Sequence, residues 1–330
     1  MKNTQVILAF RPQGMVQESD MALATVELPQ LADGQFLVQI QYISLDPAIR
    51  GWMNAGTTYI KGIEIGAPIR TFSAGIVIES KHTNFLVGEY VWGLLGAQQY
   101  AITDGMGMVK ADVSKGNLSW HLGILGMPGM TAYFGLLDKG KPQAGETVLI
   151  SGAAGIVGTT VGQIAKLNGC RVVGIAGGAD KCKFLIEEMG FDAAIDYKNE
   201  SVAEGIARTC PDKVNVFFDN VGGDILDDAL ANLAMGARVV ICGAISQYNA
   251  LEIKGPRNYM KIVTARGYIT GIIVFDYANR FQEGINDIAD WLKAGKIHTK
   301  EDIDEGLENF PATLIKLYTG QNFGKLLLKI

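Results

Sequence analysis

Residues 147–158 read Thr-Val-Leu-Ile-Ser-Gly-Ala-Ala-Gly-Ile-Val-Gly. Strand-favouring residues enter a turn of small residues, and apolar residues then recur at helical spacing until Asn168-Gly169 offers a helix end. A strand, a glycine turn and a helix let backbone N–H groups approach a pyrophosphate at the positive end of the helix. The candidate contacts are Gly152, Ala153, Ala154, Gly155, Ile156, Val157 and Gly158.

The turn departs from the usual Gly-x-Gly-x-x-Gly pattern at one position. When Gly155 and Gly158 are aligned with the last two glycines, Ala153 stands where the first should be. A glycine-rich turn without a ligand is therefore the alternative. Further short apolar runs predict strands at residues 171–176, 193–195, 214–218 and 238–242, with a helix over residues 180–190. Strands that alternate with helices predict a parallel, doubly wound sheet.

The end of the second predicted strand, Ala176-Gly177-Gly178, indicates which dinucleotide binds. NAD sites usually carry an acidic residue here that holds the ribose 2′-hydroxyl, whereas NADP sites have room and positive charge. Lys181 and Lys183 lie just beyond Gly177, which favours NADP, although we interpret Lys183 as a solvated residue. We expect Asp180 to cap the following helix rather than to bind ribose.

Length and composition indicate a folded protein of two domains. The chain has 330 residues, of which 48% are hydrophobic and 41 are glycine, and its net charge is only −5. No basic stripe is present, which argues against a nucleic-acid partner. Neither a signal-peptide core nor a run of about 18 apolar residues occurs, so we expect a soluble, cytoplasmic protein without a membrane partner.

The sequence provides no pattern of metal ligands or disulfides. The cysteines are widely spaced and form no Cys-x-x-Cys pair, and the three histidines are isolated from them and from one another. They are Cys170, Cys182, Cys210 and Cys242, with His82, His121 and His298. We therefore expect no metal, and we interpret the histidines as surface or packing residues.

The periodicity of apolar residues changes near Gly126. Before it, residues 35–43 alternate with the period of a strand, residues 71–80 and 88–94 are strand-like, and helical periodicity is scarce before Trp120. This pattern predicts a mainly β, barrel-like domain followed by the α/β domain. After Gly243, we expect a strand at residues 266–274, helices at residues 281–292 and 306–318, the second interrupted at Pro311, and a closing strand at residues 325–330.

Several ordered motifs are spread over nearly the whole chain. They are Ser44-Leu45-Asp46-Pro47, Gly126-Met127-Pro128-Gly129-Met130-Thr131-Ala132-Tyr133, the glycine turn, Asp219-Asn220-Val221-Gly222-Gly223, Cys242-Gly243-Ala244-Ile245-Ser246-Gln247-Tyr248-Asn249 and Asn322-Phe323-Gly324-Lys325. In this order the motifs resemble those of the zinc-independent branch of the medium-chain dehydrogenase/reductase superfamily. Within that branch the chain is similar to the NADPH-dependent alkenal/one reductases, which include leukotriene B4 12-hydroxydehydrogenase/prostaglandin reductases and the curcumin reductase-like type.

The resemblance implies a fold, an activity and an assembly. The implied α/β fold is a GroES-like, β-rich barrel domain at residues 1–125 and 297–330, plus a Rossmann domain with a doubly wound parallel sheet at residues 126–296. The implied reaction is NADPH-dependent reduction of the carbon–carbon double bond of an α,β-unsaturated ketone or aldehyde. Members of the family are commonly dimers, so a homodimer is expected.

The resemblance also assigns roles to single residues. Lys181 and Tyr197 match the residues that hold the 2′-phosphate, and Tyr248 matches a tyrosine that reaches both cofactor and substrate. The full set of cofactor contacts then adds Gly177, Lys181, Tyr197, Asn220, Cys242, Gly243, Tyr248 and Asn322 to the glycine turn.

One departure from the family concerns the substrate. Relatives usually continue Asp-Pro with Tyr-Met-Arg, but here Ala48 follows Pro47, so an aromatic hydroxyl that faces substrate is missing. Tyr59 is a candidate to fill part of that space and is taken as the second catalytic candidate. The alternative is that Tyr59 lies on a mobile surface loop.

The chemistry of the implied reaction requires a hydrogen-bond donor. Hydride delivered to the β-carbon builds negative charge on the carbonyl oxygen as an enolate, and a fixed donor must meet that charge. Tyr248 and the cofactor ribose are the candidate donors, and a packing role is the alternative for Tyr248. For the whole protein, the alternatives are a non-enzymatic NADPH-binding sensor and a quinone reductase-like oxidoreductase.

Overall fold

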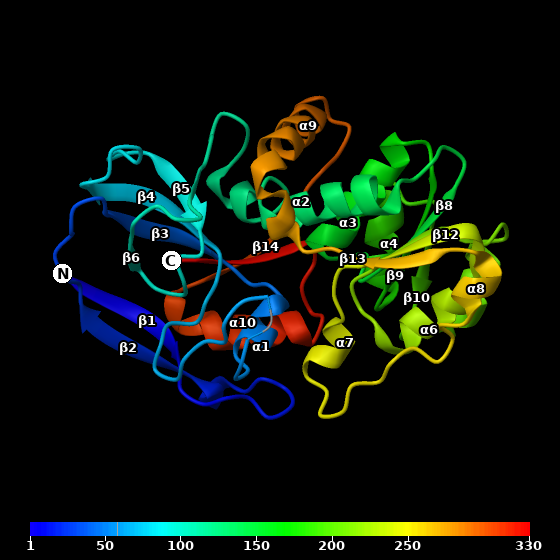
Figure 1. The fold of residues 1–330 in the computed structure, drawn as a ribbon, viewed down its shortest axis with the longest axis horizontal. Helices are drawn as coiled ribbons and strands as arrows, with labels where there is room; N and C mark the ends of the chain where they lie inside the picture. Colours follow the sequence, from blue (N-terminus) through cyan, green and yellow to red (C-terminus); the bar gives the residue numbers. More distant parts are fainter. Residues whose placement is uncertain (58) are drawn as a thin grey trace. The chain divides into compact units, whose positions relative to one another are not determined.

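The computed structural model describes residues 1–57 and 59–330, which form two compact units. One unit comprises residues 1–123 and 301–330, and the other comprises residues 124–300. The first is rich in β-structure and the second is a doubly wound parallel sheet, which confirms the predicted fold class (Figure 1). Within the described residues, no helix is both long and apolar enough to cross a membrane.

The β-rich unit is built on a seven-stranded sheet and a separate hairpin of β1 and β2. Its strands are β1 (Lys2–Leu8), β2 (Met21–Glu27), β3 (Phe36–Ser44), β4 (Ser73–Ser80), β5 (Tyr90–Gly93), β6 (Tyr100–Thr103), β7 (Val109–Lys110), β14 (Glu301–Glu305) and β15 (Lys325–Lys329). Its helical segments are η1 (Glu18–Asp20), α1 (Ala48–Trp52), η2 (Leu118–Leu122), η5 (Leu307–Asn309) and α10 (Phe310–Tyr318). The large sheet has the order β14-β15-β3-β4-β5-β7, and β6 pairs with β3.

The end of the chain completes this sheet. Strand β15 pairs antiparallel with β3, so the predicted closing strand does return to the first domain. The buried Lys325 ammonium donates to the Leu45 carbonyl at 3.0 Å and to the Asp46 carboxylate at 2.9 Å. This buried ion pair joins β15 to the segment that begins α1, and losing either partner would leave an uncompensated buried charge.

The second unit contains six parallel strands in the order β10-β9-β8-β11-β12-β13. The strands are β8 (Thr147–Ser151), β9 (Arg171–Ala176), β10 (Ala193–Asp196), β11 (Val214–Asp219), β12 (Leu233–Ile241) and β13 (Tyr268–Gly271). The helices are α2 (Met127–Phe134), α3 (Ile156–Leu167), α4 (Ala179–Glu187), α5 (Val202–Thr209), α6 (Gly223–Ala231), α7 (Ile245–Tyr248), α8 (Lys261–Ala265) and α9 (Phe281–Lys293), with η3 (Gly135–Gly140) and η4 (Val274–Arg280). The chain first runs outward from β8 to β10 and then returns to β11, which makes β8 and β11 the topological switch point.

Both faces of this sheet are covered, as a parallel sheet requires. Helices α2, α3 and α9 pack together on one side, whereas α6 lies on the other (Figure 1). Strand β9 shows the alternation: Val173 and Ile175 join the apolar cluster beneath α5 and α6. Gly174 faces the other way, where an added Cβ would lie 2.8 Å from Ala153 and Leu185. Only a residue without a side chain lets the glycine turn and α4 come this close to β9.

The structure corrects three expectations about elements and adds one short helix. Only Tyr268–Gly271 of the strand expected at residues 266–274 is a strand, because Arg266 adopts a left-handed conformation after α8 and η4 begins at Val274. Pro311 does not interrupt a helix but lies in the first turn of α10, where its missing N–H costs nothing. Asp180 is not a cap, since α4 begins at Ala179 with Gly178 before it. The short helix α1 was not expected.

Candidate functional site

The glycine turn lies at the carboxyl end of β8, at the switch point. Gly152 has a positive φ of 58°, the Gly155 N–H donates to the Gly152 carbonyl at 3.1 Å, and α3 begins at Ile156. The turn therefore feeds directly into the N-terminus of a twelve-residue helix. Ligands of open parallel sheets bind in the crevice beyond the carboxyl ends at this point, and a helix N-terminus favours an anion there.

The geometry explains why alanine replaces the first glycine of the pattern. The positive φ falls on Gly152, one residue before Ala153, and Ala153 itself has an ordinary conformation. An added Cβ on Gly158 would lie 2.6 Å from the Ala153 Cα and 2.7 Å from the Gly152 carbonyl oxygen. Gly158 thus lets the helix pack against the turn, and the turn retains the small-residue surface that a pyrophosphate needs.

Asp219, at the carboxyl end of β11, connects three turns of the crevice. Its buried carboxylate accepts the Ser151 hydroxyl at 2.7 Å and the Val221 and Gly222 N–H groups at 3.0 Å. Its carbonyl accepts the Cys242 N–H at 2.8 Å. Burial raises the pKa of this carboxyl above its ordinary value, and the three donated hydrogen bonds oppose that shift. The turns after β8, β11 and β12 are therefore held as one framework.

Asn220 and Cys242 lie on this framework. The Asn220 N–H donates to the Ser151 hydroxyl oxygen at 2.8 Å, and its side-chain amide donates to the Ser151 carbonyl at 2.7 Å. The orientation of the carboxamide is thereby fixed. Desolvation, followed by the negative charge of Asp219, raises the pKa of the Cys242 thiol to about 12. At neutral pH this thiol is therefore protonated and uncharged.

Tyr248 ends α7 and folds back over the turn that precedes it. Its hydroxyl accepts the Ala244 N–H at 3.1 Å, and an added Cβ on Gly243 would lie 2.8 Å from the same hydroxyl. The structure therefore brings Gly243 and Tyr248 together beside the Asp219 framework. A phenol that accepts a backbone N–H keeps its own proton for donation in another direction.

The carboxyl end of β9 carries the residues expected to choose the dinucleotide. An added Cβ on Gly177 would lie 2.8 Å from both Cζ and Oη of Tyr197, so the ring lies directly on the glycine. Asp196 is an acidic residue at the neighbouring strand end, but its carboxylate accepts the Gly178 N–H at 2.7 Å and the Asn199 amide at 2.7 Å. Lys181 lies in the first turn of α4, with Asp180 beside it.

Two predicted site residues belong to the β-rich unit. Tyr59 is exposed, and its hydroxyl accepts the indole N–H of Trp52 at 3.0 Å. Asn322 is buried, and its side-chain amide donates to the Gly324 carbonyl at 3.3 Å. Ala48 is the first residue of α1. Sequence reasoning did not single out Trp52, Ser151 or Asp219, although Asp219 directly precedes Asn220 in a quoted motif.

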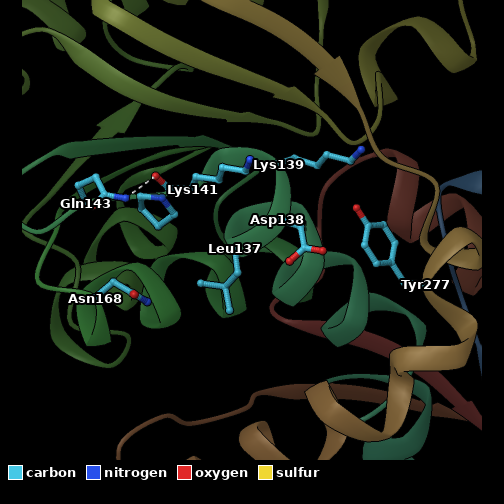
Figure 2. Close-up of a pocket in the computed structure, with 8 residues that line it drawn as sticks. Leu137, Asp138, Lys139, Lys141, Gln143, Asn168 and Tyr277 are labelled. Atoms are coloured by element: carbon cyan, nitrogen blue, oxygen red, sulfur yellow. Dashed lines mark hydrogen bonds between the residues drawn. The ribbon is translucent and has the colours of Figure 1, made fainter.

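A cavity of about 760 Å³ in the second unit lies elsewhere (Figure 2). Lys141 and Gln143 precede β8 and Asn168 follows α3, which places the cavity at the amino edge of the sheet rather than at the switch point. Its lining residues are Leu137, Asp138, Lys139, Lys141, Pro142, Gln143, Asn168 and Tyr277, none of which is a predicted site residue. Lys139 and Lys141 lie at the C-terminal end of η3, where cations compensate the helix dipole.

Metal ligands do not cluster in the described part of the chain. Residues 1–57 and 59–330 contain no group of three or more His, Cys, Asp or Glu side chains that could hold a metal ion. The four cysteines are free thiols.

Comparison with known proteins places the chain in a family. A family model described as the N-terminal domain of oxidoreductase matches residues 4–111, and one described as zinc-binding dehydrogenase matches residues 157–290. The chain is 40% identical to the NADPH-dependent curcumin reductase of Escherichia coli over 100% of this chain and 97% of that protein. It is 38% identical to the NADP(+)-dependent 2-alkenal reductase of Nicotiana tabacum, over 99% of this chain and 97% of that protein.

A solved structure agrees with this placement. CurA from Vibrio vulnificus in complex with NADPH superimposes with a TM-score of 0.93 at 40% identity, covering 99% of this chain and 98% of that chain. The chain therefore belongs to the zinc-independent medium-chain dehydrogenase/reductase family, as the sequence motifs predicted. The quinone oxidoreductases of Pseudomonas syringae and Escherichia coli match at 22% and 20% identity, which shows a shared fold alone.

Proposed function

We propose that the protein reduces the carbon–carbon double bond of α,β-unsaturated ketones and aldehydes with NADPH. The observation that carries this proposal is the match, over the whole chain at 40% identity, to a protein named for NADPH-dependent curcumin reduction. The site supports it, because small residues, a helix N-terminus and a rigid set of turns meet at the switch point.

NADPH is the proposed cofactor, and the residues at the end of β9 fit its 2′-phosphate. Gly177 and Gly178 leave room there, and Lys181 in the first turn of α4 supplies positive charge. The carboxylate of Asp196 is held by the Gly178 N–H and other donors, so it does not need a ribose hydroxyl as a partner. We assign Lys181 and Tyr197 to the 2′-phosphate, and residues 152–158 to the pyrophosphate.

The nicotinamide side of the site is assigned to the Asp219 framework. We propose that Asn220, Cys242 and Gly243 form its wall, and that the buried Asn322 is the C-terminal cofactor contact. The Cys242 thiol stays protonated, so it would place an uncharged group beside the neutral dihydronicotinamide ring. NADPH supplies the hydride, which would add to the β-carbon of the substrate, and solvent would then supply the proton that adds to the α-carbon of the enolate.

Tyr248 is the proposed donor to the substrate oxygen. Charge builds on the carbonyl oxygen as the enolate forms, and a donor that is already oriented stabilises it without reorganisation. The bond from the Ala244 N–H to the Tyr248 hydroxyl provides such an orientation. We assign Tyr59 a second contact with substrate, in place of the aromatic hydroxyl that Ala48 lacks.

We also propose a cytoplasmic homodimer that forms along β13. This strand is an edge of the six-stranded sheet, and exposed apolar side chains occur on it, on the adjacent β12 and at α8. They are Met235, Met260, Val263, Tyr268 and Ile269. An exposed apolar edge strand is a template for pairing with another chain.

The dimer is tested by light scattering after gel filtration. We expect a dimer for the unmodified protein and a monomer for Ile269→Lys. Ile303→Lys is the matched control, because Ile303 is a similarly exposed isoleucine on β14 of the other unit. Retention of the dimer by Ile269→Lys, or its loss in Ile303→Lys, would rule out the β13 surface.

The reaction is tested by following NADPH oxidation with a panel of enones, enals and quinones, alongside NADPH binding by titration. We expect turnover with enones and enals. Intact binding without turnover on any compound would favour the NADPH sensor, and turnover with quinones alone would favour a quinone reductase.

A further inference from the structure

Trp52 is placed to orient the Tyr59 hydroxyl. It is the last residue of α1, its side chain is only 3% exposed, and its indole N–H donates to the Tyr59 oxygen at 3.0 Å. An indole nitrogen can only donate, so the Tyr59 oxygen must be the acceptor. The phenolic proton therefore cannot point toward Trp52 and is directed elsewhere.

The loop that carries Tyr59 has a closed base. The Ile63 N–H donates to the Trp52 carbonyl at 2.7 Å, and the Gly62 N–H donates to the Gly56 carbonyl at 2.8 Å. An added Cβ on Gly62 would lie 2.2 Å from the Asn54 carbonyl oxygen, so the base accepts only glycine there. The two ends of the loop are thus fixed together, while Tyr59 near its tip remains 53% exposed.

Arg70 adds a positive charge to this arrangement. Its guanidinium lies 6.0 Å from the centre of the Trp52 ring, before the loop, and donates to the carbonyl of Lys61, which follows Tyr59 in the loop, at 2.7 Å. Desolvation lowers the pKa of Arg70, and its interaction with the Tyr59 hydroxyl opposes that shift. An arginine nevertheless stays charged in proteins, so the charge beside the phenol is permanent.

The bond between Trp52 and Tyr59 is not a simple requirement of burying an indole. Trp92 of β5 is equally buried at 2% exposure, and its indole nitrogen has no hydrogen-bond partner among the described residues. The same unit thus tolerates a buried indole N–H without a partner. Burial alone therefore does not explain why the Trp52 indole donates to the exposed Tyr59.

We propose that Trp52 and Arg70 are positioning residues that hold Tyr59 as a hydrogen-bond donor to an oxygen of the enone substrate. Trp52 fixes the direction of the phenolic proton, and Arg70 stabilises negative charge on the oxygen that receives it. This inference rests on the proposed enone reduction and on the proposed contact of Tyr59 with substrate.

A double-mutant cycle with Trp52→Phe and Tyr59→Phe tests the coupling. The measurements are kcat/KM for benzylideneacetone and KM for NADPH. We expect each single change to lower kcat/KM by about twofold to tenfold, the range for one hydrogen bond, with KM for NADPH unchanged. The double variant should be no slower than Tyr59→Phe alone, because Trp52 acts through that hydroxyl.

The matched control is Trp92→Phe, which removes an equally buried indole that makes no hydrogen bond. Whether Tyr59 is intact or replaced by phenylalanine, this control should lower kcat/KM by the same factor, or not at all. If Trp52→Phe behaves in the same way, or leaves kcat/KM unchanged, the positioning role is wrong. A Tyr59→Phe variant with full activity overturns it too, while enone reduction by the unmodified protein would still stand.

Arg70→Gln keeps the test decisive should Trp52→Phe fold poorly. Glutamine keeps a polar amide at this position, but the charge is gone. We expect lower kcat/KM for benzylideneacetone at unchanged KM for NADPH, and no further loss when Tyr59→Phe is added. An equal loss with and without the Tyr59 hydroxyl would contradict the role of Arg70.

Discussion

Replacing Gly177 by alanine should weaken the binding of NADPH by displacing Tyr197. The added Cβ would lie 2.8 Å from Cζ and Oη of the ring, whereas ordinary contacts begin at 3.4 Å. Tyr197 is 46% exposed, so its ring can swing outward and relieve the overlap. The free energy of unfolding should therefore change by less than about 0.5 kcal/mol, as for other surface substitutions.

The substitution should instead weaken the binding of NADPH. A hydrogen bond to a charged group contributes about 1.5 to 3 kcal/mol, so losing the Tyr197 contact with the 2′-phosphate should raise the Kd of NADPH about tenfold to a hundredfold. NADH lacks this phosphate, and its Kd should stay unchanged.

Titration of both cofactors by fluorescence or calorimetry measures this effect. Tyr197→Phe should reproduce part of the loss, and Gly255→Ala is the control, because a Cβ on Gly255 would meet no atom within 4 Å. The reasoning is refuted if Gly177→Ala binds NADPH normally while Tyr197→Phe does not. It is also refuted if NADPH and NADH weaken by the same factor.

Three further predictions concern single side chains. Lys181→Ala should remove most of the preference for NADPH over NADH, about tenfold to a hundredfold in the ratio of Kd values, and an unaltered ratio would exclude its contact with the phosphate. Tyr248→Phe should lower kcat by about a hundredfold or more at unchanged Kd for NADPH, as when one oxyanion donor is removed. An undiminished kcat would leave the ribose hydroxyl as the donor. Burial lowers the pKa of His121 below its ordinary value of 6.5, so the unfolded chain takes up a proton that the fold resists. The stability that neutral His121 contributes is present above that ordinary value and is lost as pH falls through the lower pKa of the folded state. His121→Gln should therefore flatten the fall in Tm between about pH 7 and pH 5. An equally steep fall in the variant would contradict this.

Local patterns in the sequence predicted most of the parallel sheet. Strand β9 was expected at its observed bounds, and the end of α3 at Asn168-Gly169 is confirmed, since apolar runs and glycine caps are short-range signals. Strand β14 was missed because its sequence, Glu-Asp-Ile-Asp-Glu, lacks the usual strand formers. Pairing with β15 and bonds from Lys316 to Asp302 and Asp304 hold it in place. These contacts depend on residues that pattern reading does not bring together.

The proposed site came partly from local patterns and partly from the family. Spacing indicated the glycine turn and the end of β9, and resemblance to the family added Tyr197 and Tyr248. The contact of Gly177 with Tyr197 and the bond from Ser151 to Asp219 join separate strands, so no local pattern reports them. Trp52 was not singled out, because no local pattern links it to Tyr59; only the fold brings its indole nitrogen to the Tyr59 hydroxyl.

The central claim is that hydride adds to the β-carbon of the conjugated alkene and not to the carbonyl carbon. The direct measurement is product analysis by NMR after reduction of benzylideneacetone with NADPH deuterated at the transferable position. The account predicts a saturated ketone that carries deuterium on the β-carbon. Deuterium on a carbinol carbon, with the alkene retained, would contradict it.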